Sequence, residues 1–365
     1  MVTSTKVKGT VAIMTIPDKL TFEEFELPEV EAGGILVKVV RANVCGSDVG
    51  ILNGESPFNR VLGHEMVGEV VKLGEGVSTD YAGNPVQIGD RVAATYFQIC
   101  RKCRPCLDGR FHLCLNSYAH WTKEPNETPH FHGAFGTHYY IYPNQFFYKV
   151  PDNVPDSAAA SANCALSQVY FGLDEAKVRY GDTVLVQGAG GLGLNAAAVA
   201  KEIGATVIVI DGVKSRLEKA KQFGADYCID MNEFDTVEKR VQAILDLTDG
   251  NGVDVALEVT GVGPALNEGI KHLRVGGRYV SIGNNTPGKT IDFDPGLMTR
   301  KAINIISLVR YNPWYLNKAL QFLSKTIDKY PFGEMLDKEF KLEELYDALD
   351  QSAQRKVTRA SIVID

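Results

Sequence analysis

Short hydrophobic runs bounded by glycine, asparagine or proline dominate the chain up to about residue 150. Runs of this length and spacing are typical of β-strands separated by tight turns. The clearest predicted strands are Ile35–Val40, Val67–Val71 and Gly89–Ala93. The pattern therefore predicts a compact, β-rich barrel with irregular loops.

The pattern changes near Pro151, where an Ala-rich helical stretch begins at Asp156 and strands then alternate with helices. The predicted strands are Thr183–Gln187, Thr206–Ile210, Val253–Val259 and Arg278–Ile282, and the predicted helices are Leu192–Ile203, capped by Gly204, and Ser215–Phe223. Such a βαβαβ order predicts a parallel, doubly wound sheet. The remainder returns to mixed structure, with predicted helices Asn312–Ser324 and Leu342–Ser352 and a final strand Ala360–Ile364.

Length and composition limit the classes of protein to consider. At about 150 residues per domain, 365 residues predict two domains, and 45% hydrophobic with 23% charged residues excludes a disordered or coiled-coil chain. The net charge of -7 gives no strong attraction to nucleic acid or anionic membranes. No apolar run reaches the roughly 18 residues of a membrane span, and Met1–Gly9 has no apolar signal core. We therefore expect a cytoplasmic protein with no nucleic-acid or membrane partner.

A glycine motif lies at the start of the alternating region. The segment Gly188–Gly193 fits G-x-G-x-x-G, follows a predicted strand and opens a predicted helix, and the next strand ends in Asp211, 18 residues after Gly193. In this context the glycines permit a tight turn and close approach of the backbone to a pyrophosphate. The candidate cofactor-binding residues are Gly188, Gly190, Gly191, Leu192, Gly193, Asp211 and Arg216. A ligand-free glycine turn is the alternative interpretation.

The acid at the end of the second strand bears on which dinucleotide binds. Asp211 would accept hydrogen bonds from ribose hydroxyls and would repel a 2′-phosphate, which favours NAD over NADP. Lys214 and Arg216 follow closely, and either side chain could instead assist a 2′-phosphate. We weigh the acid more heavily and predict NAD.

Four of the seven cysteines are clustered, at Cys100, Cys103, Cys106 and Cys114. Four thiolates at such spacing suit a tetrahedral structural zinc site. An iron–sulfur cluster is the main rival, and a pair of disulfides conflicts with the expected reducing compartment. The spacing favours zinc.

A second ligand set is spread along the chain. Cys45, His64 and Cys164 together form a Cys2His set, a three-ligand pattern known for catalytic zinc with one position left open. Glu65 could approach the metal from the side, and Asp48 could accept the second N–H of His64 and fix its tautomer. Taken singly, a buried cysteine or histidine is more often inert packing.

The whole chain resembles the zinc-dependent medium-chain alcohol dehydrogenases. The motifs that carry the resemblance are C-G-S-D at 45–48, G-H-E at 63–65, G-D-R-V at 89–92, the four-cysteine loop, Cys164 and G-A-G-G-L-G at 188–193. The resemblance implies a GroES-like catalytic domain built from 1–165 and 307–365, with a Rossmann domain inserted over 166–306.

The resemblance also implies the chemistry. It implies two zinc ions per chain, one catalytic, bound by Cys45, His64 and Cys164 with Glu65 close by, and one structural, bound by the four-cysteine loop. The implied reaction is reversible, NAD-linked oxidation of a primary or secondary alcohol to an aldehyde or ketone, with Ser47 in the proton relay. A homodimer or homotetramer, formed by extending the sheet at 278–282 and 303–306, is implied as well.

Some positions depart from the family's pattern. Many relatives carry a relay histidine where this chain reads Val49-Gly50-Ile51, so the proton must leave differently, through Ser47, the cofactor ribose and water. Polyol dehydrogenases of the family often have glutamate in place of Cys164, so this cysteine favours the alcohol-type ligand set. A polyol or sugar dehydrogenase, a zinc-free quinone or enone reductase and a non-catalytic nucleotide-binding relative are the alternatives.

Two aromatic features complete the sequence-based picture. Tyr96 falls where relatives place a pocket-lining aromatic residue. The segment 116–138 is dense in histidine and aromatic residues, and two interpretations stay open for it. It either shapes the substrate pocket or is a surface loop packed by its own aromatic side chains.

Overall fold

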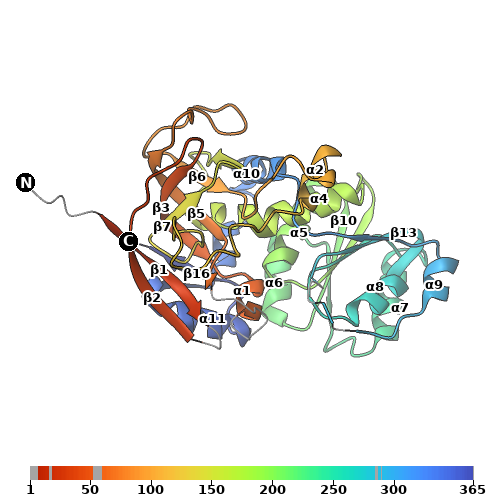
Figure 1. Ribbon diagram of the computed structural model, residues 1–365. Helices are drawn as coiled ribbons and strands as arrows, with labels where there is room; N and C mark the ends of the chain where they lie inside the picture. Colours follow the sequence, from red (N-terminus) through yellow and green to blue (C-terminus); the bar gives the residue numbers. More distant parts are fainter. Residues whose placement is uncertain (1–6, 16–18, 52–59, 284–286, 289, 365) are drawn as a thin grey trace, which may run out of the picture. The chain divides into compact units, whose positions relative to one another are not determined.

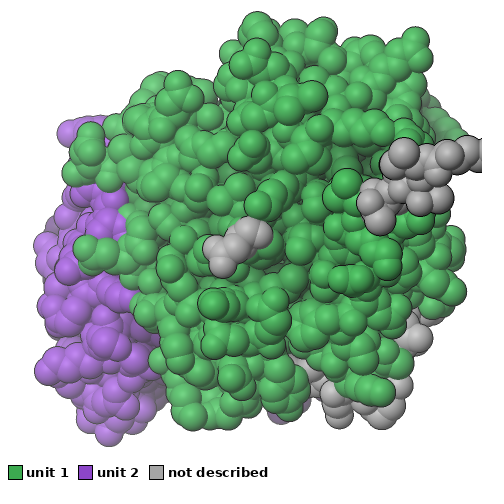
Figure 2. Space-filling model, turned by 90° about the vertical axis from the view of Figure 1, so that its left-hand side faces the viewer, with its two compact units in different colours: residues 1–164, 312–328, 332–365 green, residues 165–311, 329–331 purple. Residues whose placement is uncertain are grey.

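The chain divides into two units, one made from both of its ends and one from its middle. The computed structural model (Figure 1) describes residues 7–15, 19–51, 60–283, 287, 288 and 290–364. Unit 1 comprises residues 1–164, 312–328 and 332–365, and unit 2 comprises residues 165–311 and 329–331 (Figure 2). Residues 1–6 of the predicted polar N-terminus lie outside the described residues.

Unit 1 contains two sheets. The larger is seven-stranded, with the order β15-β16-β3-β5-β6-β8 and β7 paired to β3. The smaller has the order β2-β1-β4. Their strands are β1 (Lys8–Thr15), β2 (Lys19–Glu26), β3 (Ile35–Asn43), β4 (Arg60–Val61), β5 (Glu65–Leu73), β6 (Arg91–Ala94), β7 (His138–Ile141), β8 (Phe147–Lys149), β15 (Lys338–Lys341) and β16 (Ala360–Val363).

The hydrophobic core of unit 1 contains residues from both ends of the chain. Val37 of β3 and Val70 of β5 are fully buried and share one hydrophobic cluster with Ile362 of β16 and Leu349. β16 pairs with β3 in antiparallel register, so the last strand extends the sheet that the N-terminal strands begin. Its helical segments are α1 (Gly46–Gly50), α2 (Arg104–Leu107), η2 (Phe111–Leu113), α3 (Asp156–Ala159), α10 (Trp314–Thr326), η4 (Phe332–Met335), η5 (Leu342–Glu344) and α11 (Leu345–Ala353).

Unit 2 is a doubly wound α/β unit. Its six-stranded sheet has the order β11-β10-β9-β12-β13-β14, and every neighbouring pair is parallel. The strands are β9 (Thr183–Gln187), β10 (Thr206–Asp211), β11 (Tyr227–Asp230), β12 (Val253–Glu258), β13 (Leu273–Ser281) and β14 (Asn304–Ser307). The chain reverses its direction of winding between β9 and β12, and ligands of such sheets bind at this switch point, beyond the carboxyl ends of the strands.

In the described part of the chain, one helix leads into this sheet, and five others connect its strands. They are α4 (Ser167–Glu175), α5 (Gly191–Ile203), α6 (Lys214–Gln222), α7 (Val237–Leu247), α8 (Ala265–His272) and α9 (Pro295–Arg300), and the π-helical turn η3 (Ala162–Leu166) contains the boundary between the units. Gly204 ends α5 in the left-handed conformation at φ 95°, which confirms the predicted cap. The predicted fold class, a GroES-like β-rich part with a doubly wound parallel sheet, is confirmed.

Several predicted elements differ from the structure by one to three residues at their ends, and one strand differs by more. β13 begins at Leu273, five residues before the predicted start at Arg278, because its register against β12 shifts around the positive-φ residue Gly276. The Ala-rich stretch after Asp156 is helical, as predicted, and it is divided into α3, the π-helical turn η3 and α4. Among the described residues, no helix has the length and apolar character that a membrane crossing requires.

Candidate metal centres and nucleotide loop

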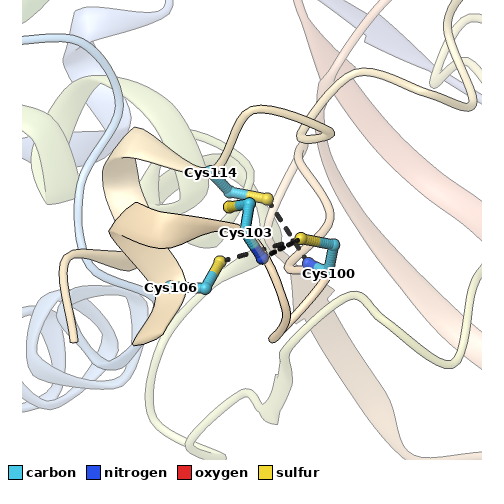
Figure 3. A group of neighbouring side chains, drawn as sticks. All are labelled: Cys100, Cys103, Cys106 and Cys114. Atoms are coloured by element: carbon cyan, nitrogen blue, oxygen red, sulfur yellow. Dashed lines mark hydrogen bonds between the residues drawn. The ribbon is translucent and has the colours of Figure 1, made fainter. Parts of the chain in front are cut away.

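The four clustered cysteines converge on one point (Figure 3). Their sulfur atoms all lie within 4.8 Å of one another, and the Sγ atoms of Cys100 and Cys106 are 4.0 Å apart. Backbone N–H groups of Cys103 and Cys100 point at the Sγ atoms of Cys100 and Cys114, at 3.4 and 3.3 Å. None of the seven cysteines, all of which lie among the described residues, is in a disulfide bond.

This arrangement fits a zinc ion. Zn–S bonds of about 2.3 Å in a tetrahedron put the sulfurs about 3.8 Å apart, close to the observed Cys100–Cys106 separation. Burial opposes ionisation of Cys100, but hydrogen bonds from Lys102, Asn116 and Cys103 outweigh it and lower its pKa to about 6. Burial and neighbouring sulfurs raise the pKa of Cys106 to about 12. A divalent cation is the group that lets such adjacent thiols ionise together.

The second group brings together residues from three distant segments. Cys45 precedes α1, His64 directly precedes β5, Glu65 is its first residue, and Cys164 lies in η3. The ligand atoms of these four side chains lie within 4.8 Å of one another. His64, Glu65 and Cys164 are buried, and Cys45 is partly exposed.

Asp48 connects the helix start to the histidine. Its Oδ2 accepts the backbone N–H of Cys45 at 2.9 Å, which forms part of a capping box at the start of α1. Its Oδ1 lies 3.3 Å from Nδ1 of His64. A carboxylate at Nδ1 fixes the ring so that Nε2 is left for a metal.

Charge in this group is distributed unevenly. The hydrogen bond between the two thiols lowers the pKa of Cys45 well below its usual value, with His64 acting in the same direction. The same bond, together with burial, raises the pKa of Cys164. Burial lowers the pKa of His64, but Asp48 and Cys45 outweigh it and raise the pKa overall. The group therefore favours ionisation of the Cys45 thiol over that of Cys164.

Glu65 is held from behind by Arg359. The carboxylate oxygen Oε2 accepts a hydrogen bond from this guanidinium, and both side chains are almost fully buried. Burial raises the pKa of Glu65 to about 7, against the opposing effect of Arg359. In the described part of the chain, the buried Oε1 of Glu65 has no hydrogen-bond partner. Two sulfurs, an imidazole and a carboxylate with one uncommitted oxygen are a donor set that fits zinc.

Aromatic rings surround His64. Tyr96 meets the imidazole edge-on, with ring centroids 5.3 Å apart, and Trp121 lies 5.9 Å from it. Trp121 also stacks on Tyr118 at 4.8 Å and on Tyr96 at 6.1 Å. We call Tyr96, Tyr118 and Trp121 the aromatic wall.

The two parts of the segment 116–138 lie in different surroundings. Its first part brings Trp121 to His64, as a pocket-shaping loop would. Its later part packs into the core, where Phe131 and Phe135 are fully buried. The later part is therefore built into the core of unit 1 and is not a surface loop packed by its own aromatic side chains, and the pocket-shaping role of the first part stays a prediction.

The glycine loop has the shape that a dinucleotide loop needs. Gly188 has φ 105°, and a Cβ atom on Gly193 would lie 1.9 Å from the carbonyl oxygen of Gly188, so neither position accepts a side chain without strain. Gly190 caps the start of α5 and faces open space. Gly191 and Leu192 form the first turn of that helix and are partly exposed. Free N–H groups at this helix start can bind a phosphate.

Asp211 lies at the carboxyl end of β10 beside this loop. Its Oδ2 accepts the N–H of Ala189 at 2.7 Å, and its Oδ1 accepts the N–H of Val213 at 2.8 Å. Lys214 and Arg216 follow in the first turn of α6, where Lys214 is exposed and Arg216 is partly buried. The carboxylate therefore holds the backbone of the glycine loop and of the turn that follows β10.

Sequence reasoning missed two buried residues that touch the candidate metal ligands. Arg359 precedes the last strand and has no motif around it. Asn163 directly precedes Cys164 and donates hydrogen bonds to the carbonyl oxygens of His64 and Ala94. Adjacency to a predicted ligand was the one signal that could have identified Asn163.

Comparisons with known proteins agree with this geometry. Residues 31–152 match the family described as alcohol dehydrogenase GroES-like domain, and residues 191–325 match the family described as zinc-binding dehydrogenase. The chain is 34% identical to 5-exo-hydroxycamphor dehydrogenase of Pseudomonas putida over 93% of this chain and 94% of that one. It is 35% identical to sorbitol dehydrogenase of Halalkalibacterium halodurans over 82% and 84%.

A solved structure shows the same fold. An alcohol dehydrogenase from Thermotoga maritima superposes with a TM-score of 0.92 at 30% identity, covering 98% of this chain and all of the other. The two matched families together span most of the chain, and both are families of dehydrogenases. The chain therefore belongs to the zinc-dependent medium-chain dehydrogenase/reductase family and is an oxidoreductase of that family.

Proposed function

We propose that this chain is an NAD-linked alcohol dehydrogenase that interconverts a primary or secondary alcohol and the corresponding aldehyde or ketone. The observation that carries the proposal is the convergence of Cys45, His64, Glu65 and Cys164 within 4.8 Å. Zinc held by Cys45, His64 and Cys164 would supply Lewis acidity toward the substrate oxygen, and a bound nicotinamide would supply the hydride acceptor.

The chain's own residues prepare this centre. The Cys45–Cys164 hydrogen bond favours a thiolate at Cys45, and Asp48 holds the imidazole of His64 in place. Arg359 holds one oxygen of Glu65, and the other oxygen has no hydrogen-bond partner among the described residues. Ordered ligands of this kind reduce the reorganisation that the reaction requires.

Ser47 is the proposed proton carrier. It lies in α1 between Cys45 and Asp48 and is exposed, so its hydroxyl can exchange a proton with water. No histidine follows at 49–51 to extend a relay. The proton would therefore pass from the substrate hydroxyl through Ser47, the cofactor ribose and water.

The aromatic wall supports the proposal that the substrate is an alcohol with an apolar carbon skeleton. A polyol requires hydrogen-bonding side chains around its additional hydroxyl groups, whereas the rings of Tyr96 and Trp121 beside His64 favour apolar contact. One relative is named for hydroxycamphor and another for sorbitol, so a polyol is the second candidate.

We propose that the catalytic domain comprises residues 1–165 and 307–365 and that the cofactor domain comprises residues 166–306. β14 ends the sheet order of unit 2, which supports a homodimer or homotetramer formed by sheet extension. A monomeric mass in light scattering would remove this part of the proposal.

A panel assay tests the proposed function. Purified enzyme is given NAD and, in turn, cyclic, aromatic and linear alcohols, diols and polyols, and NADH formation is followed. We expect apolar cyclic or aromatic alcohols to give a kcat/KM at least about tenfold above that of any polyol, since a tenfold ratio corresponds to about 1.4 kcal/mol. Higher activity on polyols would favour the second candidate, and no turnover on any alcohol or carbonyl compound would contradict the proposal.

A further inference from the structure

One buried amide joins the segments that carry the proposed zinc ligands. Asn163 is 1% exposed and lies in the π-helical turn η3, directly before Cys164. Its Nδ2 donates to the carbonyl oxygen of His64 at 2.8 Å and to that of Ala94 at 2.9 Å. An amide NH2 group has two hydrogens, so each of them has a carbonyl acceptor.

The two acceptor carbonyl groups lie at the start of β5 and at the end of β6. The carbonyl of His64 leads into Glu65, the first residue of β5. Ala94 ends β6, two residues before Tyr96 of the aromatic wall. The amide of Asn163 therefore connects the turn of Cys164 to the start of β5, where the candidate ligands His64 and Glu65 are adjacent, and to the end of β6, two residues before Tyr96.

The turn itself gives a reason for such a link. A single π-helical turn has poorer backbone hydrogen bonding than an α-helix and occurs often at functional sites. Cys164 lies 100 residues beyond His64 in the sequence, so the relative position of the two side chains depends on tertiary contacts. Two buried hydrogen bonds at fixed distances supply such a contact next to the ligand itself.

We propose that Asn163 is a positioning residue for the metal centre, which sets the distance between Cys164 and His64 and thereby the retention of zinc. The inference rests on the proposed function of the Cys45, His64 and Cys164 group. Residues that orient metal ligands typically contribute 10–100-fold to metal affinity, and we expect an effect of that size here.

The test measures zinc release from the full-length, zinc-loaded protein to a chromogenic chelator. The Cys45→Ser variant identifies which release phase belongs to this centre and which to the four-cysteine loop. We expect Asn163→Ala and the isosteric Asn163→Asp, whose carboxylate cannot donate to either carbonyl, to release this zinc about 10–100-fold faster. Asn163→Ser keeps one donor and should give an intermediate rate.

Asn195→Ala is the matched control. Asn195 is also fully buried, and its Nδ2 donates to one carbonyl oxygen, that of Gly191, at 2.8 Å. Its loss should lower stability without changing zinc release. The inference is overturned if a folded Asn163→Asp or Asn163→Ser variant releases zinc at the wild-type rate, or if Asn195→Ala accelerates release equally. The release assay does not depend on turnover. A wild-type protein that holds zinc but has no dehydrogenase activity would therefore contradict the proposed function and leave the inference on Asn163 intact.

Discussion

Asp48 acts in two ways at the start of α1. One oxygen accepts the N–H of Cys45 and the other contacts His64. A capping interaction and the orientation of a candidate ligand thus depend on the same carboxylate. The sequence predicted the contact with His64, whereas the capping of Cys45, in which the third residue after an N-cap reaches back to the cap, was seen only in the structure.

Buried partners of the ligands were not predictable in the same way. Arg359 reaches Glu65 across 294 positions of sequence, and nothing around it distinguishes it from a surface arginine. Only the pairing of β16 with β3 brings it to the site. Long-range pairs of this kind depend on strand register, which a single sequence does not specify.

Asp211 can be tested by substitution. We expect Asp211→Gly to raise the ratio of NADP to NAD use, measured as kcat/KM, by about tenfold, since it removes the charge that repels a 2′-phosphate. Because Asp211 also accepts the N–H groups of Ala189 and Val213, Asp211→Asn is the matched variant. It removes the charge and keeps one of the two acceptor oxygens, so it should shift the ratio in the same direction. An unchanged ratio in both variants would exclude this role of Asp211.

Among the elements, the regular ones were predicted well. β9 and β10 begin where the apolar runs begin, because strands buried in a parallel sheet consist of almost continuous apolar residues. Charged, largely exposed β2 was not predicted, since its burial pattern lacks a regular apolar face. The start of β13 at Leu273 was not predicted, because Gly276 and Gly277 suggest a turn when that part of the sequence is considered by itself.

The segment 116–138 buries two imidazoles that lack hydrogen-bond partners. His120 and His132 are each 1% exposed, and within the described residues none of their ring nitrogens has such a partner. Burial lowers the pKa of His120 to about 3, with His132 and Lys123 acting in the same direction. Burial likewise lowers the pKa of His132 to about 4. Both side chains are therefore neutral in the folded protein at neutral pH.

This burial predicts a pH dependence of stability. Unfolded histidine has a pKa of about 6.5, so between about pH 6.5 and pH 4 the unfolded chain binds more protons than the folded chain. The free energy of unfolding should therefore fall as the pH is lowered through this range, by up to about 1.4 kcal/mol per pH unit for each histidine. Urea unfolding between pH 7 and pH 5 measures this slope.

A variant separates this contribution from that of other groups. His120→Phe keeps a ring in place beside Trp121 and Tyr142 and removes one titrating group. Its stability should depend less steeply on pH than that of the wild type. If the slopes are equal, the buried imidazole of His120 does not contribute to acid sensitivity.

For the whole molecule, the combination and order of the motifs along the chain identified the family, which no single motif could do. Alone, G-x-G-x-x-G or a lone cysteine has little specificity. Together with the four-cysteine loop they indicated the family, which the comparisons confirm. The substrate was not predictable, because the aromatic wall depends on how the loop that carries Trp121 folds back on His64.

We propose that the chain holds two zinc ions and that one of them, bound by Cys45, His64 and Cys164, is needed for turnover. Elemental analysis of zinc per chain, made on wild type and on Cys45→Ala, tests it most directly. We predict about two zinc ions per wild-type chain and about one in the variant, which should bind NAD but lose turnover by several orders of magnitude. Full turnover in a wild-type chain without zinc, or a Cys45→Ala variant that keeps both its zinc and its activity, would contradict this claim.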